Sequence, residues 1–127
     1  HVFAPGDHGS TFGGNAIACA AVFATLSTLK SENMADKVVT RGKYFKARLQ
    51  KLADKYPDKV KEVRGEGLLL GLDLKKKGSP IVAACLEKGL IVNCTADTVI
   101  RLVPPLIVTE KEIDEAVAVL DQALAHF

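Results

Sequence analysis

Residues 8–15 read His-Gly-Ser-Thr-Phe-Gly-Gly-Asn, and they come directly before the apolar run 16–24. Glycine lets a backbone approach a ligand closely, and the hydroxyls of Ser10 and Thr11 add hydrogen-bond donors. If a helix begins near Asn15, its unpaired N–H groups point back toward this loop, as they do at many phosphate sites. A tight turn with Asn15 as helix cap explains the same residues without a ligand. The stretch therefore predicts a loop and a helix start, and it leaves two interpretations of the loop open.

The segment that follows, from Ala16 to about Lys30, is rich in alanine and apolar nearly all round. A helix of this kind is normally buried on more than one side. The changing period of apolar residues further along the chain predicts helices over 34–56, over 80–88 with Ser79 as its cap, and after Thr109. It also predicts strands over 60–63, 68–74, 90–93 and 99–103, with a break or bulge at 65–67 between the first two. Thr109 and Glu112 form a capping box. This order predicts an α+β layer, one sheet with helices over one face, preceded by a long buried helix.

Length and composition exclude several classes of protein. The chain has 127 residues, which is enough for one hydrophobic core. Its formal net charge is +2, with acidic and basic residues interleaved, so the sequence offers no concentrated basic face for nucleic acid. Its three cysteines include no C-x-x-C pair; Cys19 and Cys85 are expected to be buried, which fits a reducing cytoplasm. The nine-residue apolar run 16–24 is too short to cross a bilayer. The absence of an initiator methionine suggests the middle of a longer polypeptide or a shortened version of one.

Few residues suggest metal or nucleophilic chemistry. The three histidines, His1, His8 and His126, are scattered and predict no metal site, although His8 could belong to a ligand-binding loop. Ser10 is not in a G-x-S-x-G motif, and Cys94 is best interpreted as a packed or idle thiol.

Two arginines stand among apolar neighbours at strand ends, in Val63-Arg64-Gly65 and Ile100-Arg101-Leu102. Each needs a partner, and a bidentate carboxylate would suit it. That carboxylate could belong to a substrate or to a structural Asp or Glu, with a substrate favoured more for Arg101 than for Arg64.

Three segments, residues 3–15, 63–68 and 99–106, closely resemble segments of class III aminotransferases. They occur in the order and approximate spacing of that family, and the similarity covers essentially the whole chain. Residues 92–96, Val-Asn-Cys-Thr-Ala, look most like the acetylornithine branch. The sequence departs from the family at Ala16, where proline is usual, and in the short loop 75–78.

The resemblance implies a fold-type-I scaffold that uses pyridoxal 5′-phosphate, with this chain as its C-terminal part. Residues 1–14 would be a cofactor-contacting loop of the large domain. Residues 15–127 would be the small domain with its linking helix, built on a small, mostly antiparallel sheet. The parent would be a cytoplasmic homodimer.

The resemblance also implies roles for individual residues. Thr11 would reach across the dimer to the cofactor phosphate of the neighbouring subunit, and Ser10 would face the acyl-ornithine substrate of that site. Arg101 would bind the α-carboxylate of glutamate or 2-oxoglutarate. Arg64 would be structural.

The implied reaction moves the terminal amino group of N-acetylornithine to 2-oxoglutarate, a step of arginine biosynthesis. The Schiff-base lysine, the aspartate for the pyridine nitrogen and the ring-stacking aromatic all belong to segments outside this sequence, so we expect no catalytic residue here and no transamination by the chain alone. Ornithine, succinylornithine and 4-aminobutyrate aminotransferases share these motifs and remain alternatives. A different class also stays open, namely a non-catalytic α+β module that binds a ligand or dimerises.

Overall fold

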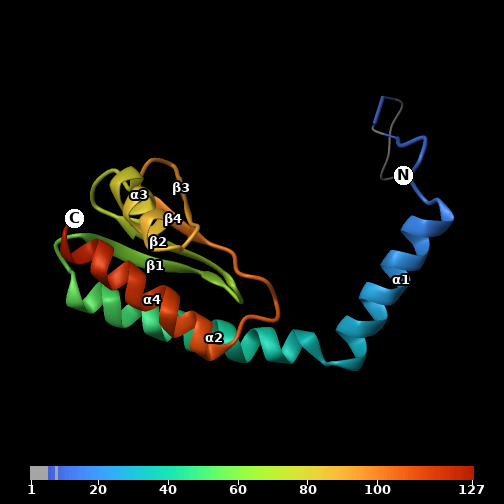
Figure 1. Cartoon of the computed structure of the whole chain (residues 1–127), viewed down its shortest axis with the longest axis horizontal. Coiled ribbons are helices and arrows are strands. Elements are labelled where there is room, and N and C mark those ends of the chain that lie inside the picture. Colours follow the sequence, from blue (N-terminus) through green and yellow to red (C-terminus); the bar gives the residue numbers. More distant parts are fainter. Residues whose placement is uncertain (1–5, 8) are drawn as a thin grey trace. The chain divides into compact units, whose positions relative to one another are not determined.

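The computed structural model describes residues 6–7 and 9–127, so His1 and His8 lie outside the described residues. The chain divides into two compact units, His1–Met34 and Ala35–Phe127, and each is described by itself (Figure 1). The first unit holds the glycine-rich loop and helix α1 (Ala16–Ser31). The second holds the sheet and the remaining helices.

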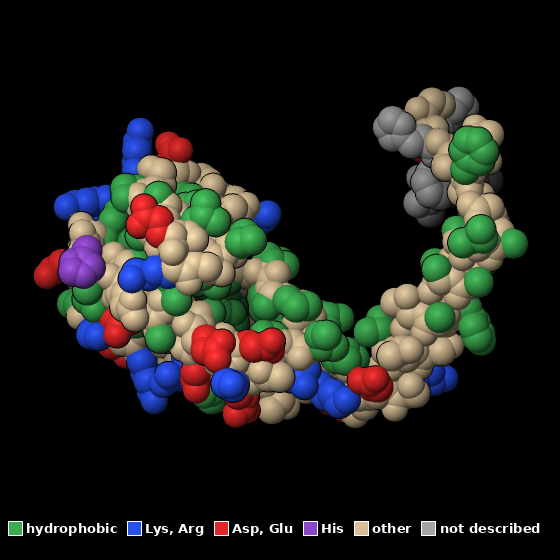
Figure 2. All heavy atoms as spheres, viewed as in Figure 1, with side chains coloured by type: hydrophobic (Ala, Val, Ile, Leu, Met, Phe, Trp, Pro, Cys, Tyr) green, Lys and Arg blue, Asp and Glu red, His purple; other side chains and the backbone are tan. Residues whose placement is uncertain are grey.

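Helix α1 forms where the sequence predicts it, but its predicted burial is wrong for this chain. None of its residues is buried, and Ile17 and Phe23 are 83% and 75% exposed. Figure 2 shows apolar side chains, in green, at the surface along this helix. Cys19 is likewise exposed, although its apolar neighbours predict a buried thiol. An apolar surface all round a helix indicates that the helix favours contact; it does not indicate that the same unit supplies the partner.

The second unit is a four-stranded antiparallel sheet with three helices. Its elements are α2 (Met34–Lys55), β1 (Val60–Glu66), β2 (Leu69–Leu74), α3 (Ser79–Glu87), β3 (Asn93–Thr95), β4 (Val99–Leu102) and α4 (Glu110–Ala125). The strands lie side by side in the order β1-β2-β4-β3. The predicted α+β fold with an antiparallel sheet is therefore confirmed.

One face of the sheet carries the core. Leu70, Leu72 and Leu74 alternate along β2 and are almost fully buried, as are Ile100 and Leu102 on β4. They pack with residues of α2, α3 and α4 in one hydrophobic cluster, so the prediction of helices over one face is confirmed. The opposite face of the sheet, called the outer face below, carries Gly71, Asp73 and Arg101, because successive side chains in a strand point to opposite sides.

Three local boundaries differ from the sequence interpretation. Strand β1 continues past its predicted end at residue 63 as far as Glu66, and the hairpin turns at Gly67-Leu68, where Gly67 has a φ of +54°. Strand β3 begins at Asn93, not at residue 90, because the amide of Leu90 still bonds the carbonyl of Cys85 in the turn after α3. Ser79 lies inside α3, and Gly78 takes the cap position without a side-chain bond.

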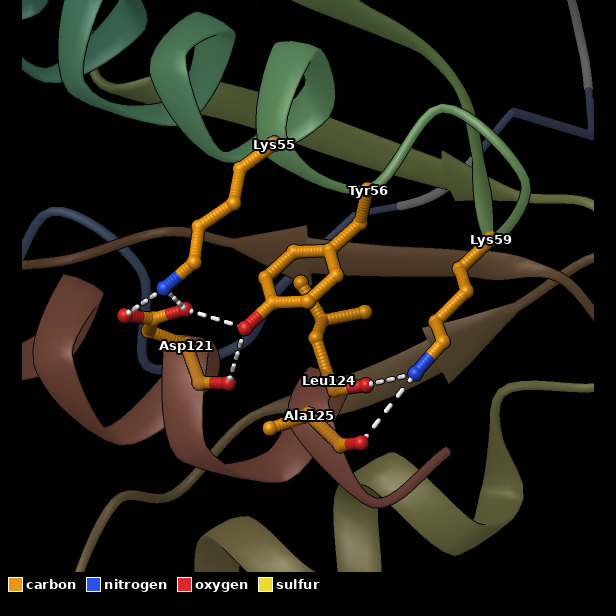
Figure 3. Close-up of polar contacts among 6 residues, drawn as sticks. All are labelled: Lys55, Tyr56, Lys59, Asp121, Leu124 and Ala125. Atoms are coloured by element: carbon orange, nitrogen blue, oxygen red, sulfur yellow. Dashed lines mark hydrogen bonds and ion pairs between the residues drawn. The ribbon is translucent and has the colours of Figure 1, made fainter.

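Helices α2 and α4 lie side by side and are joined by polar contacts at both ends of their interface. Asp121 of α4 accepts hydrogen bonds from Lys55 Nζ at 2.7 and 2.8 Å and from Tyr56 OH at 2.6 Å (Figure 3). Lys59 Nζ donates to the carbonyl of Leu124 at 2.6 Å, which satisfies an acceptor at the end of α4. Asp114 of α4 accepts further hydrogen bonds from Tyr44 OH and Arg48 Nε of α2.

Gly42 lies inside α2, where glycine costs helix stability, and the structure supplies the reason. A Cβ at this position would collide with the backbone of Gly67 in the β1–β2 turn. The glycine therefore allows the helix and the hairpin to approach closely.

We expect Gly42→Ala to destabilise the second unit by about 1–3 kcal/mol, because backbone must move to admit the methyl group. In an unobstructed helix the same change stabilises by about 1 kcal/mol, so the sign of the effect is diagnostic. Urea unfolding measures it, with Lys43→Ala at the adjacent exposed position as control. A stabilised Gly42→Ala variant would contradict the close approach.

The hydrogen bonds that Asp121 accepts from Lys55 and Tyr56 predict a pH dependence of stability. Hydrogen bonds from Lys55 and then Tyr56 lower the pKa of Asp121 from its ordinary 3.8. A carboxylate whose folded pKa is depressed stabilises the fold above its unfolded pKa, and this contribution is lost as the pH falls through the folded pKa. Asp121→Asn should therefore lower the free energy of unfolding at pH 7 by roughly 0.5–1 kcal/mol, the range of a solvent-screened pair.

The difference between wild type and Asp121→Asn should shrink as the pH falls below 3.8. Denaturant unfolding at several pH values measures it, and Glu87→Gln, an exposed carboxylate on α3, serves as the control. A difference that stays constant down to low pH would show that the charge of Asp121 contributes nothing.

Candidate functional site

The glycine-rich loop is fixed to the start of α1 by Asn15. The side chain of Asn15 accepts a hydrogen bond from the Ala18 amide at 3.0 Å and donates one to the Phe12 carbonyl at 2.7 Å. A turn closes between the Gly13 amide and the Ser10 carbonyl at 3.3 Å. The predicted cap is thus confirmed, and Asn15 joins the loop to the helix from both sides.

Ser10 and Thr11 lie exposed on this loop, ahead of the helix N-terminus. Within the described residues neither hydroxyl makes a side-chain hydrogen bond, and the space that a Cβ on Gly9 or Gly14 would occupy is open. Donor hydroxyls and backbone amides with open space around them suit a phosphate group. The donor set therefore fits the phosphate of pyridoxal 5′-phosphate. The role of Asn15 as helix cap is compatible with phosphate binding by this loop.

Arg101 lies in β4, in the second unit, and its side chain is on the outer face. Antiparallel pairing places it opposite Gly71 of β2 on one side and opposite Asn93 of β3 on the other. Arg64 of β1 is the next partner of Gly71. The pairing thus forms one row of residues across the four strands, in the order Arg64, Gly71, Arg101 and Asn93. A glycine, which has no side chain, lies between the two arginines.

The two arginines have different partners. Arg64 lies near structural carboxylates, with its Nε 3.6 Å from Glu62 Oε1 and its Nη2 3.9 Å from Asp73 Oδ2. Arg101 donates from Nε to the neutral Oδ1 of Asn93 at 3.2 Å. Among the described residues no carboxylate pairs with Arg101, whereas the sequence left a structural Asp or Glu open for both arginines.

Asp73 is the buried acid of the outer face, with only 6% of its surface exposed. Thr98 Oγ1 donates to its Oδ1 at 2.8 Å, and Lys61 Nζ lies 3.6 Å from its Oδ2. Sequence patterns alone did not predict that Asp73, Gly71 and Asn93 lie on this face. The alternation of β2 contained a signal for the first two, but the pairing of Asn93 with Arg101 depends on strand order and register.

The candidate site residues are divided between the two units. Ser10 and Thr11 belong to the first unit, and Arg101 belongs to the second.

Other site chemistry finds no support in the described part of the chain. No group of three His, Cys, Asp or Glu residues there could hold a metal ion. No helix among the described residues is long and apolar enough to cross a membrane. Cys85 is buried as predicted, and burial raises the pKa of its thiol.

Comparison with known proteins decides the family. The aminotransferase class-III family matches residues 1–124. The chain belongs to this family. Acetylornithine aminotransferases of Methanocaldococcus jannaschii and Caldanaerobacter subterraneus subsp. tengcongensis are 48% and 49% identical over 95% and 98% of the chain. An ornithine aminotransferase of Bacillus subtilis is 42% identical over 98%.

Solved aminotransferase structures share the fold. The acetylornithine aminotransferase of Elizabethkingia anophelis covers 98% of the chain with a TM-score of 0.85 and 33% identity. A lysine aminotransferase of Mycobacterium tuberculosis covers 96% with a TM-score of 0.88 and 31% identity. The chain spans 34% and 28% of those two structures, and 30% to 32% of the three sequence relatives named above. Class-III aminotransferases use pyridoxal 5′-phosphate.

The two hydrogen bonds of the Asn15 side chain predict that this residue holds the loop against α1. Asn15→Ala should remove the cap and cost about 1 kcal/mol at the helix start, which corresponds to roughly fivefold faster hydrogen exchange at the Ala18 amide. Asn15→Ser retains a capping oxygen and is the matched control. Unchanged Ala18 exchange in Asn15→Ala would contradict the capping role.

Proposed function

We propose that this chain is the C-terminal segment of a pyridoxal-phosphate-dependent aminotransferase that transfers the terminal amino group of N-acetylornithine to 2-oxoglutarate. The observation that carries the proposal is the state of Arg101. It is an exposed arginine on the outer face of the sheet, hydrogen-bonded to a neutral side chain and without a carboxylate partner among the described residues. Such a guanidinium is suited to a carboxylate of the substrate.

Arg101 would bind the α-carboxylate of glutamate or 2-oxoglutarate through paired hydrogen bonds. Gly71, paired with it on β2, has no side chain that could engage the guanidinium. Arg64 already has carboxylate neighbours, so we assign it a structural role. Arg101 would thus position the substrate, because its binding energy holds the reacting atoms in the correct place.

The loop residues would act at a cofactor site shared between the subunits of a homodimer. Thr11 would donate its hydroxyl to the cofactor phosphate of the neighbouring subunit, and Ser10 would face the acyl-ornithine substrate there. The cofactor, when bound, supplies the electron sink for the transfer. Asn15 would keep the loop in place, because its side chain bonds both the loop and the helix.

We further propose that the chain alone catalyses no transamination. None of its lysines lies in the sequence context of the family's Schiff-base lysine, and lysines such as Lys55 and Lys59 are engaged in helix contacts. Turnover by the isolated chain supplied with pyridoxal 5′-phosphate would refute this.

Ornithine aminotransferase is the second candidate, supported by the Bacillus subtilis relative at 42% identity. Both candidates use 2-oxoglutarate as acceptor and differ in the amino donor. Comparing kcat/KM for N-acetylornithine, ornithine and N-succinylornithine with the full-length protein distinguishes them. A preference for N-acetylornithine is expected.

Arg101→Lys in the full-length protein should raise the KM for 2-oxoglutarate roughly 30-fold, because a lysine cannot replace a bidentate, charge-assisted contact worth about 2 kcal/mol. Steady-state kinetics with varied 2-oxoglutarate measures the effect. Arg64→Lys is the matched control on the same face and should change the KM less than about 3-fold, since a screened surface ion pair contributes little. Equal effects of the two changes would remove the basis for assigning the carboxylate to Arg101.

A further inference from the structure

We propose that Asn93 is a positioning residue for substrate binding, because it holds the Nε of Arg101 and so fixes the direction of its guanidinium. This inference rests on the proposed function, in which Arg101 binds a substrate carboxylate. It adds a second residue, on a neighbouring strand, to that binding site. It also predicts how the carboxylate approaches.

The pairing of β3 with β4 places Asn93 directly opposite Arg101. Directly paired residues of antiparallel strands project from the same face, and Asn93 Oδ1 accepts the Nε hydrogen bond at 3.2 Å. On the other flank Gly71 has no side chain that could hold the arginine. Asn93 is therefore the side chain in this row that restrains Arg101.

A restraint matters because an unrestrained arginine samples many rotamers. Binding a ligand then requires ordering of the side chain, and that cost weakens affinity. One hydrogen bond at Nε sets the plane of the guanidinium before the ligand arrives. The two Nη groups remain available, so the carboxylate approaches end-on, toward Nη1 and Nη2.

The neutral character of Asn93 is as important as its position. Arg48 and Arg64 have carboxylate neighbours, with Arg48 Nε only 2.7 Å from Asp114 Oδ1. A carboxylate compensates the positive charge that an anionic ligand would use. Asn93 instead orients Arg101 without compensating its charge, and no described carboxylate pairs with this guanidinium. Orientation by a neutral partner suits an arginine that binds an anion.

The test uses the full-length holoenzyme and measures the dissociation constant of 2-oxoglutarate by titration calorimetry, together with KM and kcat. Asn93→Ala should weaken binding about fivefold, the size expected for one hydrogen bond. Asn93→Asp should weaken it more than alanine does, because aspartate keeps the contact but neutralises Arg101. Both variants should raise KM with little change in kcat.

Thr95→Ala is the matched control. Thr95 lies two residues along β3, on the same face, and pairs with Val99. Its replacement should change the dissociation constant less than twofold. Asn93 is exposed, so Asn93→Ala should leave the thermal unfolding temperature unchanged.

Arg101→Gln separates this inference from the proposed function. If Arg101→Gln does not weaken 2-oxoglutarate binding, the proposed function fails. If it does, Asn93→Ala must have no further effect in the Arg101→Gln background, because Asn93 acts only through Arg101. An equal loss in both backgrounds, a wild-type affinity for Asn93→Ala, or tighter binding by Asn93→Asp would overturn the positioning role.

Discussion

The register between β2 and β4 is the constraint on which the rest of the second unit depends. It pairs Leu70 with Leu102 and Leu72 with Ile100 on the core face, and Gly71 with Arg101 on the outer face. A slip of β4 by one residue would turn Ile100 and Leu102 toward solvent and Arg101 into the core. Burial of the leucines therefore fixes the place of the candidate binding residue, although the two sets of side chains lie on opposite faces of the sheet.

The helices hold this register from the core side. Leu49 of α2, Ile81 of α3 and Leu120 of α4 are almost fully buried against the sheet. Asp121 and Asp114 then tie α4 to α2 at two points along their length. The close approach of α2 to the β1–β2 turn at Gly42 adds a contact that admits no Cβ. The outer face is thus supported by a layer that takes no part in ligand chemistry.

Sequence patterns predicted the elements of this fold because those patterns are local. The capping box at Thr109 and the cap at Asn15 form as expected, and the helices begin within about a residue of their predicted starts. The motifs also predicted the family, which the comparisons confirm.

What the sequence could not provide depends on partners distant along the chain. The neutral partner of Arg101 lies eight residues earlier, in a strand whose start was predicted three residues too soon. Burial of α1 and Cys19 was inferred from apolarity alone, and in the structure no residue of α1 is buried and Cys19 is exposed. Register, strand order and burial each require contacts that a local pattern does not specify.

A crystal structure of the full-length protein with bound 2-oxoglutarate would decide the role of the outer face. The account predicts that both Nη atoms of Arg101 lie within hydrogen-bond distance of the α-carboxylate oxygens while Nε stays on Asn93. A carboxylate bound by another cationic residue, with Arg101 paired to a protein Asp or Glu, would contradict it.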